Sequence, residues 1–190
     1  MIFLSASVPT PQREYYGTEN IFAIREAIIA FTTVCVKYGV RFYFGGHPAI
    51  TPLIWNVAMQ NVKQGMPLID IYQSKIFGDK IPNEVKDFKN VHLTEPVNDS
   101  IKDSVIAMRK QMFAENPIDC AIFIGGMQGI IDEYDMLKQE YPNAQYYAFA
   151  STGGASVELY KKIGYCNELL ENSYAYLSIF RTLLAPYITK

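Results

Sequence analysis

The sequence predicts an α/β protein with a Rossmann-like three-layer fold, in which helices flank a mostly parallel central sheet. Two patterns predict it: short apolar runs alternate with longer segments of helical period, and glycine pairs follow three of the runs. The composition agrees, because 49% hydrophobic and 19% charged residues are typical of a globular chain. A length of 190 residues favours one domain, 1–190, with helices at 156–188 packing on it.

Six runs are expected to form the strands, because each is short, apolar and rich in β-branched or aromatic residues. They span residues 2–6, 40–44, 68–72, 91–93, 120–124 and 146–150. Since helical segments separate most of them, the strands are expected to run parallel.

Four crossover helices are expected between these strands. The first, 20–38, has apolar residues at helical spacing and stops at Gly39, which suits the left-handed cap position. The second spans 48–64, and the third and fourth span 99–115 and 129–140. The tail, 156–186, predicts one or two more helices. Residues 74–90 predict a connection with one short helical turn, or alternatively a flap.

Several classes of partner are excluded by simple counts. A formal net charge of −2 provides no positive field for nucleic acid, and no apolar stretch approaches the ~20 residues that span a bilayer.

The first residues resemble a strand rather than a signal peptide, so a cytoplasmic protein is expected. Three cysteines and two histidines without metal-ligand spacing predict no disulfide, no metal and no cofactor.

The glycine pairs mark the candidate site. In an open parallel sheet, ligands bind outside the carboxyl ends of the strands, where main-chain amides can converge on an anion. We therefore expect a phosphorylated or nucleotide-like ligand there, although tight packing alone also explains such glycines. Neither GxGxxG nor GxxxxGK[ST] occurs in these turns. The pairs are Gly45-Gly46, Gly125-Gly126 and Gly153-Gly154, with hydroxyl donors expected at Ser5, Ser7, Thr51, Ser151 and Thr152.

Three side chains beside these turns carry charge or a titratable ring. Arg109 points out of the middle of an apolar helical arc, so its guanidinium needs a ligand phosphate or an internal ion pair. Glu133, in the first turn of the following helix, is the natural partner, and the helix dipole is the simpler reason for an acid there. His47 either donates a hydrogen bond to the ligand or caps its own turn.

One segment carries a family resemblance. Arg109-Lys110, an apolar strand and Gly125-Gly126-Met127-Gln128-Gly129-Ile130-Ile131-Asp132-Glu133 resemble the Arg-Lys … Pro-Gly-Gly-x-Gly-Thr-x-x-Glu signature of the LOG phosphoribohydrolases, often labelled lysine decarboxylase-like. Residues 3–9, 44–54 and 150–155 are similar to the wider SLOG superfamily, which also contains DprA-like proteins and sensor domains for nucleotide-derived signals. The resemblance implies a Rossmann-like fold that holds its ligand over the glycine turns.

The resemblance also implies roles for two residues. Arg109 and Glu133 match the positions that act when LOG enzymes cleave the N-glycosidic bond of a nucleoside monophosphate. This sequence departs from the signature: Ile124 replaces Pro, one extra residue separates Gly126 from Gly129, and Ile130 replaces Thr. We therefore expect a sensor of the non-enzymatic branch, of the kind found in bacterial anti-phage defence. It is expected to bind a nucleotide-derived ligand, such as an ADP-ribose-like molecule, without turnover. A LOG-like hydrolase is the alternative.

The residues expected to bind the ligand are Ser5, Ser7, Gly45, Gly46, His47, Thr51, Arg109, Gly125, Gly126, Met127, Gly129, Glu133, Ser151, Thr152, Gly153 and Gly154. A third possibility is a purely structural or assembly role. LOG-like proteins are commonly dimers, so a homodimer or higher oligomer is expected. The aromatic tail, with Tyr174, Tyr176, Phe180 and Tyr187, then either buries an interface or simply covers the sheet.

Overall fold

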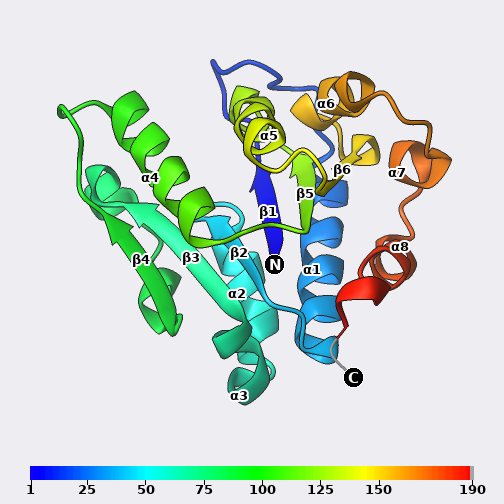
Figure 1. Cartoon of the computed structure of the whole chain (residues 1–190), viewed down its shortest axis with the longest axis horizontal. Coiled ribbons are helices and arrows are strands. Elements are labelled where there is room, and N and C mark those ends of the chain that lie inside the picture. Colours follow the sequence, from blue (N-terminus) through cyan, green and yellow to red (C-terminus); the bar gives the residue numbers. More distant parts are fainter. Residues whose placement is uncertain (189–190) are drawn as a thin grey trace.

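A six-stranded, fully parallel sheet forms the centre of the protein (Figure 1). The structure, a computed structural model, describes residues 1–188, without the side chains of residues 62 and 64. The strands are β1 (Ile2–Ser7), β2 (Phe42–Gly45), β3 (Ile69–Ser74), β4 (Asn90–Thr94), β5 (Cys120–Gly125) and β6 (Gln145–Phe149). All six predicted strands are present, and the predicted α/β fold is confirmed.

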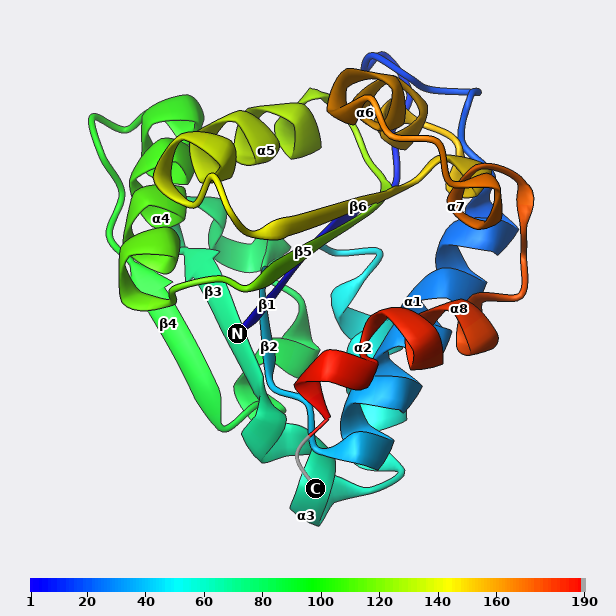
Figure 2. The ribbon, with the colours of Figure 1, turned by 45° about the vertical axis from the view of Figure 1, so that its right-hand side comes forward.

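Helices cover both faces of the sheet (Figure 2). On one face, α4 (Ile101–Glu115) and α5 (Gln128–Glu140) pack on β1 and β5, as the 5.2 Å between the Phe3 and Phe113 ring centres shows. On the other face lie α1 (Ile21–Tyr38), α2 (Thr51–Met59) and α8 (Tyr176–Leu183), with Phe31 of α1 4.9 Å from Phe42. The burial of such rings on both faces forms the core.

The predicted helix boundaries hold where capping residues are strong. Asn20 accepts a hydrogen bond from the Ala23 amide and begins α1, and Gly39, at φ +69°, ends it. Ser100 caps α4 in the same way. Within residues 1–188 no helix has the combination of length and hydrophobicity that crossing a bilayer requires.

Three predicted segments differ from the structure. The second helix breaks at Asn61, giving α2 and the short α3 (Val62–Gly65), because Asn61 has non-helical backbone angles. The tail contains three α-helices rather than one or two: α6 (Ala155–Ile163), α7 (Glu168–Asn172) and α8. Gly164, in the left-handed region, separates α6 from α7. The expected connection at 74–90 contains two 3-10 helices, η2 (Lys75–Lys80) and η3 (Asn83–Asp87).

The strand order places the site. The sheet runs β4-β3-β2-β1-β5-β6, so the chain moves outward from β1 to β4 and then returns past β1 to form β5. This reversal makes a topological switch point between β1 and β5, and ligands of open α/β sheets bind outside the carboxyl ends of the strands at such a point.

Candidate functional site

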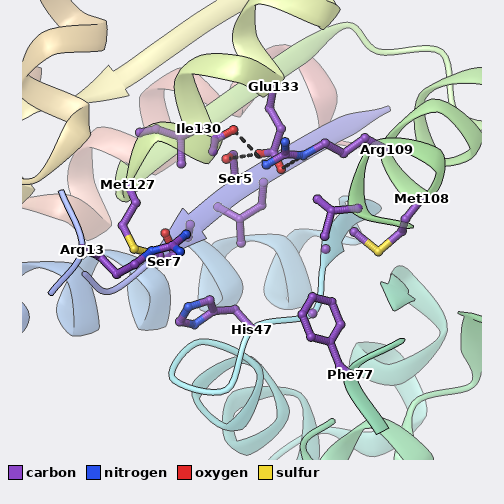
Figure 3. Close-up of a pocket in the computed structure, with 16 residues that line it drawn as sticks. Ser5, Ser7, Arg13, His47, Phe77, Met108, Arg109, Met127, Ile130 and Glu133 are labelled. Carbon is purple, nitrogen blue, oxygen red and sulfur yellow. Dashed lines mark hydrogen bonds and ion pairs between the residues drawn. The ribbon is translucent and has the colours of Figure 1, made fainter. Parts of the chain in front are cut away.

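A pocket of about 210 Å³ lies at this switch point (Figure 3). Its walls come from the ends of β1 and β2, the middle of α4 and the start of α5. It brings together more than half of the residues expected to bind a ligand: Ser5, Ser7, Gly45, Gly46, His47, Arg109, Met127, Gly129 and Glu133. Segments far apart in the sequence thus converge where the fold favours ligand binding.

A hydrogen-bonded ion pair forms one wall. Arg109 Nε donates to Glu133 Oε1 at 2.8 Å, and Ser5 donates its hydroxyl proton to Glu133 Oε2. The Arg109 and Glu133 side chains are only 12% and 14% exposed. Arg109 Nη2 also donates to the Gly129 carbonyl at 3.1 Å, which ties α4 to the start of α5. The internal ion pair that the sequence left open is therefore present, and it lies on the pocket wall.

The ion pair changes the charge balance of the pocket. Glu133 neutralises Arg109, and Asp132 Oδ2 lies 3.8 Å from Arg109 Nη1. Arg109 therefore does not present an uncompensated positive charge to a ligand. Each Glu133 oxygen, in contrast, has two lone pairs and one donor within residues 1–188, so each can accept a further hydrogen bond from a ligand.

The amides of the first two glycine pairs are already occupied. Gly46 donates to the Tyr72 carbonyl at 2.9 Å, and Gly126 donates to the Ser7 carbonyl at 2.8 Å. The Gly125 amide donates to Thr152 Oγ1 at 2.8 Å. These turns thus join neighbouring strands, and the amides named here bond within the protein. Gly45 and Gly46 line the pocket, whereas Gly125 and Gly126, which were expected to bind the ligand, do not.

The third glycine pair lies outside the pocket. The Gly154 amide donates to the Thr18 carbonyl at 3.2 Å, and Gly153 forms a β-bridge with Glu19. The expected hydroxyl donors outside the pocket also bond within the protein. Ser151 bonds to the Tyr176 hydroxyl at 3.1 Å, Thr152 donates to the Phe149 carbonyl at 2.6 Å, and Thr51 accepts from the His47 amide at 3.0 Å.

The backbone amides that can still face a ligand are those at the start of α5, directly after the Gly125-Gly126 pair. Met127, with extended backbone, precedes the helix, and no side chain caps it within the described residues. The first amides of a helix have no intrahelical acceptor and carry the positive end of its dipole. Since Met127 and Gly129 line the pocket, this positive helix end faces it.

The sequence matches the SLOG cluster3 family over residues 14–184. The chain belongs to this family. The predicted membership of the SLOG superfamily is thereby confirmed, and the matched range includes both Arg109 and Glu133. Among curated proteins, none matches the sequence.

Two pocket residues of this SLOG cluster3 protein lie outside the sequence prediction. Arg13, from the loop between β1 and α1, lines the pocket and forms no ion pair with any residue of 1–188. The loop is fixed by a 2.6 Å hydrogen bond from the Tyr15 hydroxyl to Glu158 of α6, which raises the pKa of Tyr15 to about 12. The second residue is Phe77, in η2. Both lie in irregular segments, where residue spacing carries little information.

His47 of the SLOG cluster3 protein is an uncharged donor. Burial lowers the pKa of its imidazole to about 4, so the ring is neutral near pH 7. Nδ1 accepts a hydrogen bond from the Ala49 amide at 3.2 Å, which places the proton on Nε2. His47 therefore both fixes its own turn and retains an N–H for a ligand.

We expect the free energy of unfolding to fall between about pH 6.5 and pH 4, because the unfolded His47 takes up a proton that the folded one does not. Stability rises with pH in this window, by at most about 1.4 kcal/mol per pH unit and by less because the ring is not fully buried. Urea unfolding at pH 7 and pH 5 measures the effect. His47→Gln should lose less stability on acidification than the wild type, and an equal loss would contradict the assignment.

Proposed function

We propose that this SLOG cluster3 protein binds a nucleotide-derived, anionic small molecule at the switch point and acts as a sensor without turnover. The observation that supports this most is the pocket itself, where the Ser5–Glu133–Arg109 network lies beside the uncapped start of α5. A volume of about 210 Å³ is below the ~300–1,000 Å³ common for ligand pockets, which favours a mononucleotide-sized ligand over a dinucleotide.

The polar groups of the pocket complement the parts of such a ligand. Arg13 and the start of α5 supply positive charge for a phosphate. Glu133 accepts hydrogen bonds from ribose hydroxyls, and His47 Nε2 donates one. The ligand thereby gains charge-assisted contacts both at its phosphate and at the Glu133 carboxylate, and a neutral hydrogen bond from His47.

The local structure around Ile130 supports binding without turnover. Ile130 occupies the place where the LOG signature has Thr, and its side chain lies over Gly126: a Cβ at Gly126 would be 2.6 Å from Ile130 Cγ2. An apolar side chain therefore covers the turn from which the signature hydroxyl would donate to a phosphate. This departure supports placing the chain in the sensor branch of the superfamily. A role in bacterial defence and a cytoplasmic location belong to the same proposal.

A LOG-like N-glycoside hydrolase is the second candidate, because a carboxylate lies in the pocket wall. In that reaction Glu133 would assist a water molecule or stabilise the oxocarbenium-like ribose as the bond to the base breaks. The ion pair with Arg109 and the hydrogen bond from Ser5 would hold the carboxylate in position.

One experiment separates the two candidates. The protein is incubated with nucleoside monophosphates, ADP-ribose and NAD, and thermal shift and free base are both measured. A sensor should be stabilised by at least one intact nucleotide and release no base. Base release that disappears in Glu133→Gln would identify the hydrolase, and absence of both binding and release would contradict the proposal.

We also propose a homodimer or higher oligomer, supported by exposed apolar side chains rather than by the whole aromatic tail. Tyr176 and Phe180 are buried against the protein, whereas Tyr174 is 63% exposed and Phe22 of α1 is 82% exposed. Tyr174 lies beside α1, next to Glu26, one helical turn after Phe22. Light scattering on the samples used for the binding experiment gives the assembly mass, and a monomer mass would contradict this part.

A further inference from the structure

We propose that Phe77 is the platform on which the planar base of the ligand stacks, so that the pocket selects an aromatic ring at the end opposite its phosphate. This inference rests on the proposed function, because it assigns one part of a nucleotide-derived ligand to one residue. It deepens that function by naming the residue that would distinguish a nucleotide from a bare sugar phosphate.

The exposure of Phe77 sets it apart from the other phenylalanines. Every phenylalanine of the chain except Phe22 and Phe77 is buried in the core. Phe22 lies on the outer surface of α1, whereas Phe77 is half-buried and lines the pocket. It does not pack on the hydrophobic core, and no aromatic ring of residues 1–188 lies against it. The face of this ring is therefore available to a ligand.

Local contacts hold the backbone on either side of Phe77. Ser74 caps η2 by accepting a hydrogen bond from the Ile76 amide, and Lys75 pairs with Glu95, which directly follows β4. Gly78 turns the chain at φ +50° and ψ −125°, which lies outside the regions that L-residues favour. Since the turn on either side of Phe77 is held in this way, a ligand has only the side chain of Phe77 to order and not its backbone, which lowers the cost of binding.

The opposite wall suits an aromatic ligand. Met108 and Val105 of α4 line the pocket together with Phe77, and Met108 is only 6% exposed. Methionine and aromatic rings make favourable contacts with flat π-systems. The base would thus lie in an apolar slot between η2 and α4.

The order of groups along the pocket matches a nucleoside 5′-phosphate. In Figure 3, Arg13, Ser7 and Met127 lie at one end, the Ser5–Glu133–Arg109 network lies in the middle, and Phe77 and Met108 lie at the other end. Positive charge thus lies where the phosphate would bind, a hydrogen-bond acceptor lies where the ribose hydroxyls would bind, and an apolar ring lies where the base would bind. A ligand without a base would leave the apolar end empty.

Isothermal titration calorimetry with adenosine 5′-monophosphate and with ribose 5-phosphate tests the proposal. The wild type should bind the nucleotide at least about tenfold more tightly than the sugar phosphate, because base–aromatic stacking contributes affinity of this size. Phe77→Ala should remove most of this difference by weakening nucleotide binding alone. Phe77→Tyr should preserve it, and Leu169→Ala, a change of an exposed apolar residue outside both the pocket and the proposed oligomer interface, should leave both affinities unchanged.

The outcomes separate this inference from the proposed function. If the wild type binds the nucleotide and Phe77→Ala leaves its preference over ribose 5-phosphate intact, the stacking role is wrong and the proposed function stands. If Phe77→Ala weakens both ligands equally, the ring only supports the pocket structure, and the inference is likewise overturned. If the wild type binds neither compound, the stacking of an adenine base on Phe77 is overturned, while the thermal shifts with the other nucleotides, ADP-ribose and NAD decide the proposed function separately.

Discussion

Arg109→Met is expected to destabilise the protein by about 3 kcal/mol, the size usual when one partner of a largely buried ion pair is removed. The Glu133 carboxylate, 14% exposed, would lose its charged partner and retain only the hydrogen bond from Ser5. The Gly129 carbonyl would lose its donor as well, which loosens the contact between α4 and α5. Methionine retains the length of the arginine stem, so little packing is lost.

The double variant Arg109→Met, Glu133→Gln separates the ion pair from the packing. It removes both charges at once, so no unpaired carboxylate is left in the pocket wall, and we expect most of the lost stability to return. The double variant should also bind the ligand more weakly than the wild type, because an amide offers the ribose hydroxyls one uncharged oxygen acceptor where the Glu133 carboxylate offers two. Urea unfolding and thermal shift with adenosine 5′-monophosphate measure the two effects. A double variant as unstable as Arg109→Met would show that Arg109 contributes through packing rather than through the charge pair.

The fold could be predicted from the sequence because its signals are local. Each strand run is bounded by turn residues, and α1 begins and ends at the strong caps Asn20 and Gly39. The break at Asn61 was not predicted, because an asparagine in an otherwise apolar helical pattern is only a weak stop signal. Local sequence preferences thus predict where the helices and strands lie. They fail at Asn61, where one polar residue decides whether the chain forms one helix or two.

The candidate site could be predicted only in part. Whether a glycine amide is free for a ligand or already bonded to a carbonyl depends on the order of the strands. The Gly126 amide bonds to Ser7 since β5 pairs with β1, and the Gly46 amide bonds to Tyr72 since β2 lies beside β3. No spacing within the sequence contains this information. The pairing of Arg109 with Glu133 was accessible, because a cation on an apolar helical arc needs a partner.

The position of the third glycine pair, Gly153-Gly154, also depends on strand order and could not be predicted from residue spacing. Because β6 is the edge strand beyond β5, the turn that follows it lies away from the switch point, beside the start of α1. Arg13 and Phe77 show the converse: they reach the pocket from loops and 3-10 turns, whose course is set by tertiary contacts such as the Tyr15–Glu158 hydrogen bond.

Gly154→Ala is expected to destabilise the protein by about 3 kcal/mol or more, although this residue lies outside the pocket. Its backbone, at φ +63° and ψ −154°, occupies a region that is essentially restricted to glycine, where strain alone costs of the order of 1–3 kcal/mol. An added Cβ would also lie 2.8 Å from the Gly126 carbonyl oxygen and 3.0 Å from the Gly125 carbonyl carbon, and backbone atoms cannot move away as a side chain can.

Gly164→Ala is the matched control, because Gly164 also has a positive φ, +79°, but an added Cβ there meets no atom within 4 Å. Only the left-handed conformation is then penalised, at about 1 kcal/mol. Urea unfolding of the two variants therefore shows how much more Gly154→Ala costs than the ordinary left-handed penalty at Gly164, and equal losses would show that neither the glycine-only backbone region nor the contact with Gly126 adds to the loss. Because Gly126 precedes the start of α5, Gly154→Ala should also weaken nucleotide binding, whereas Gly164→Ala should leave it unchanged.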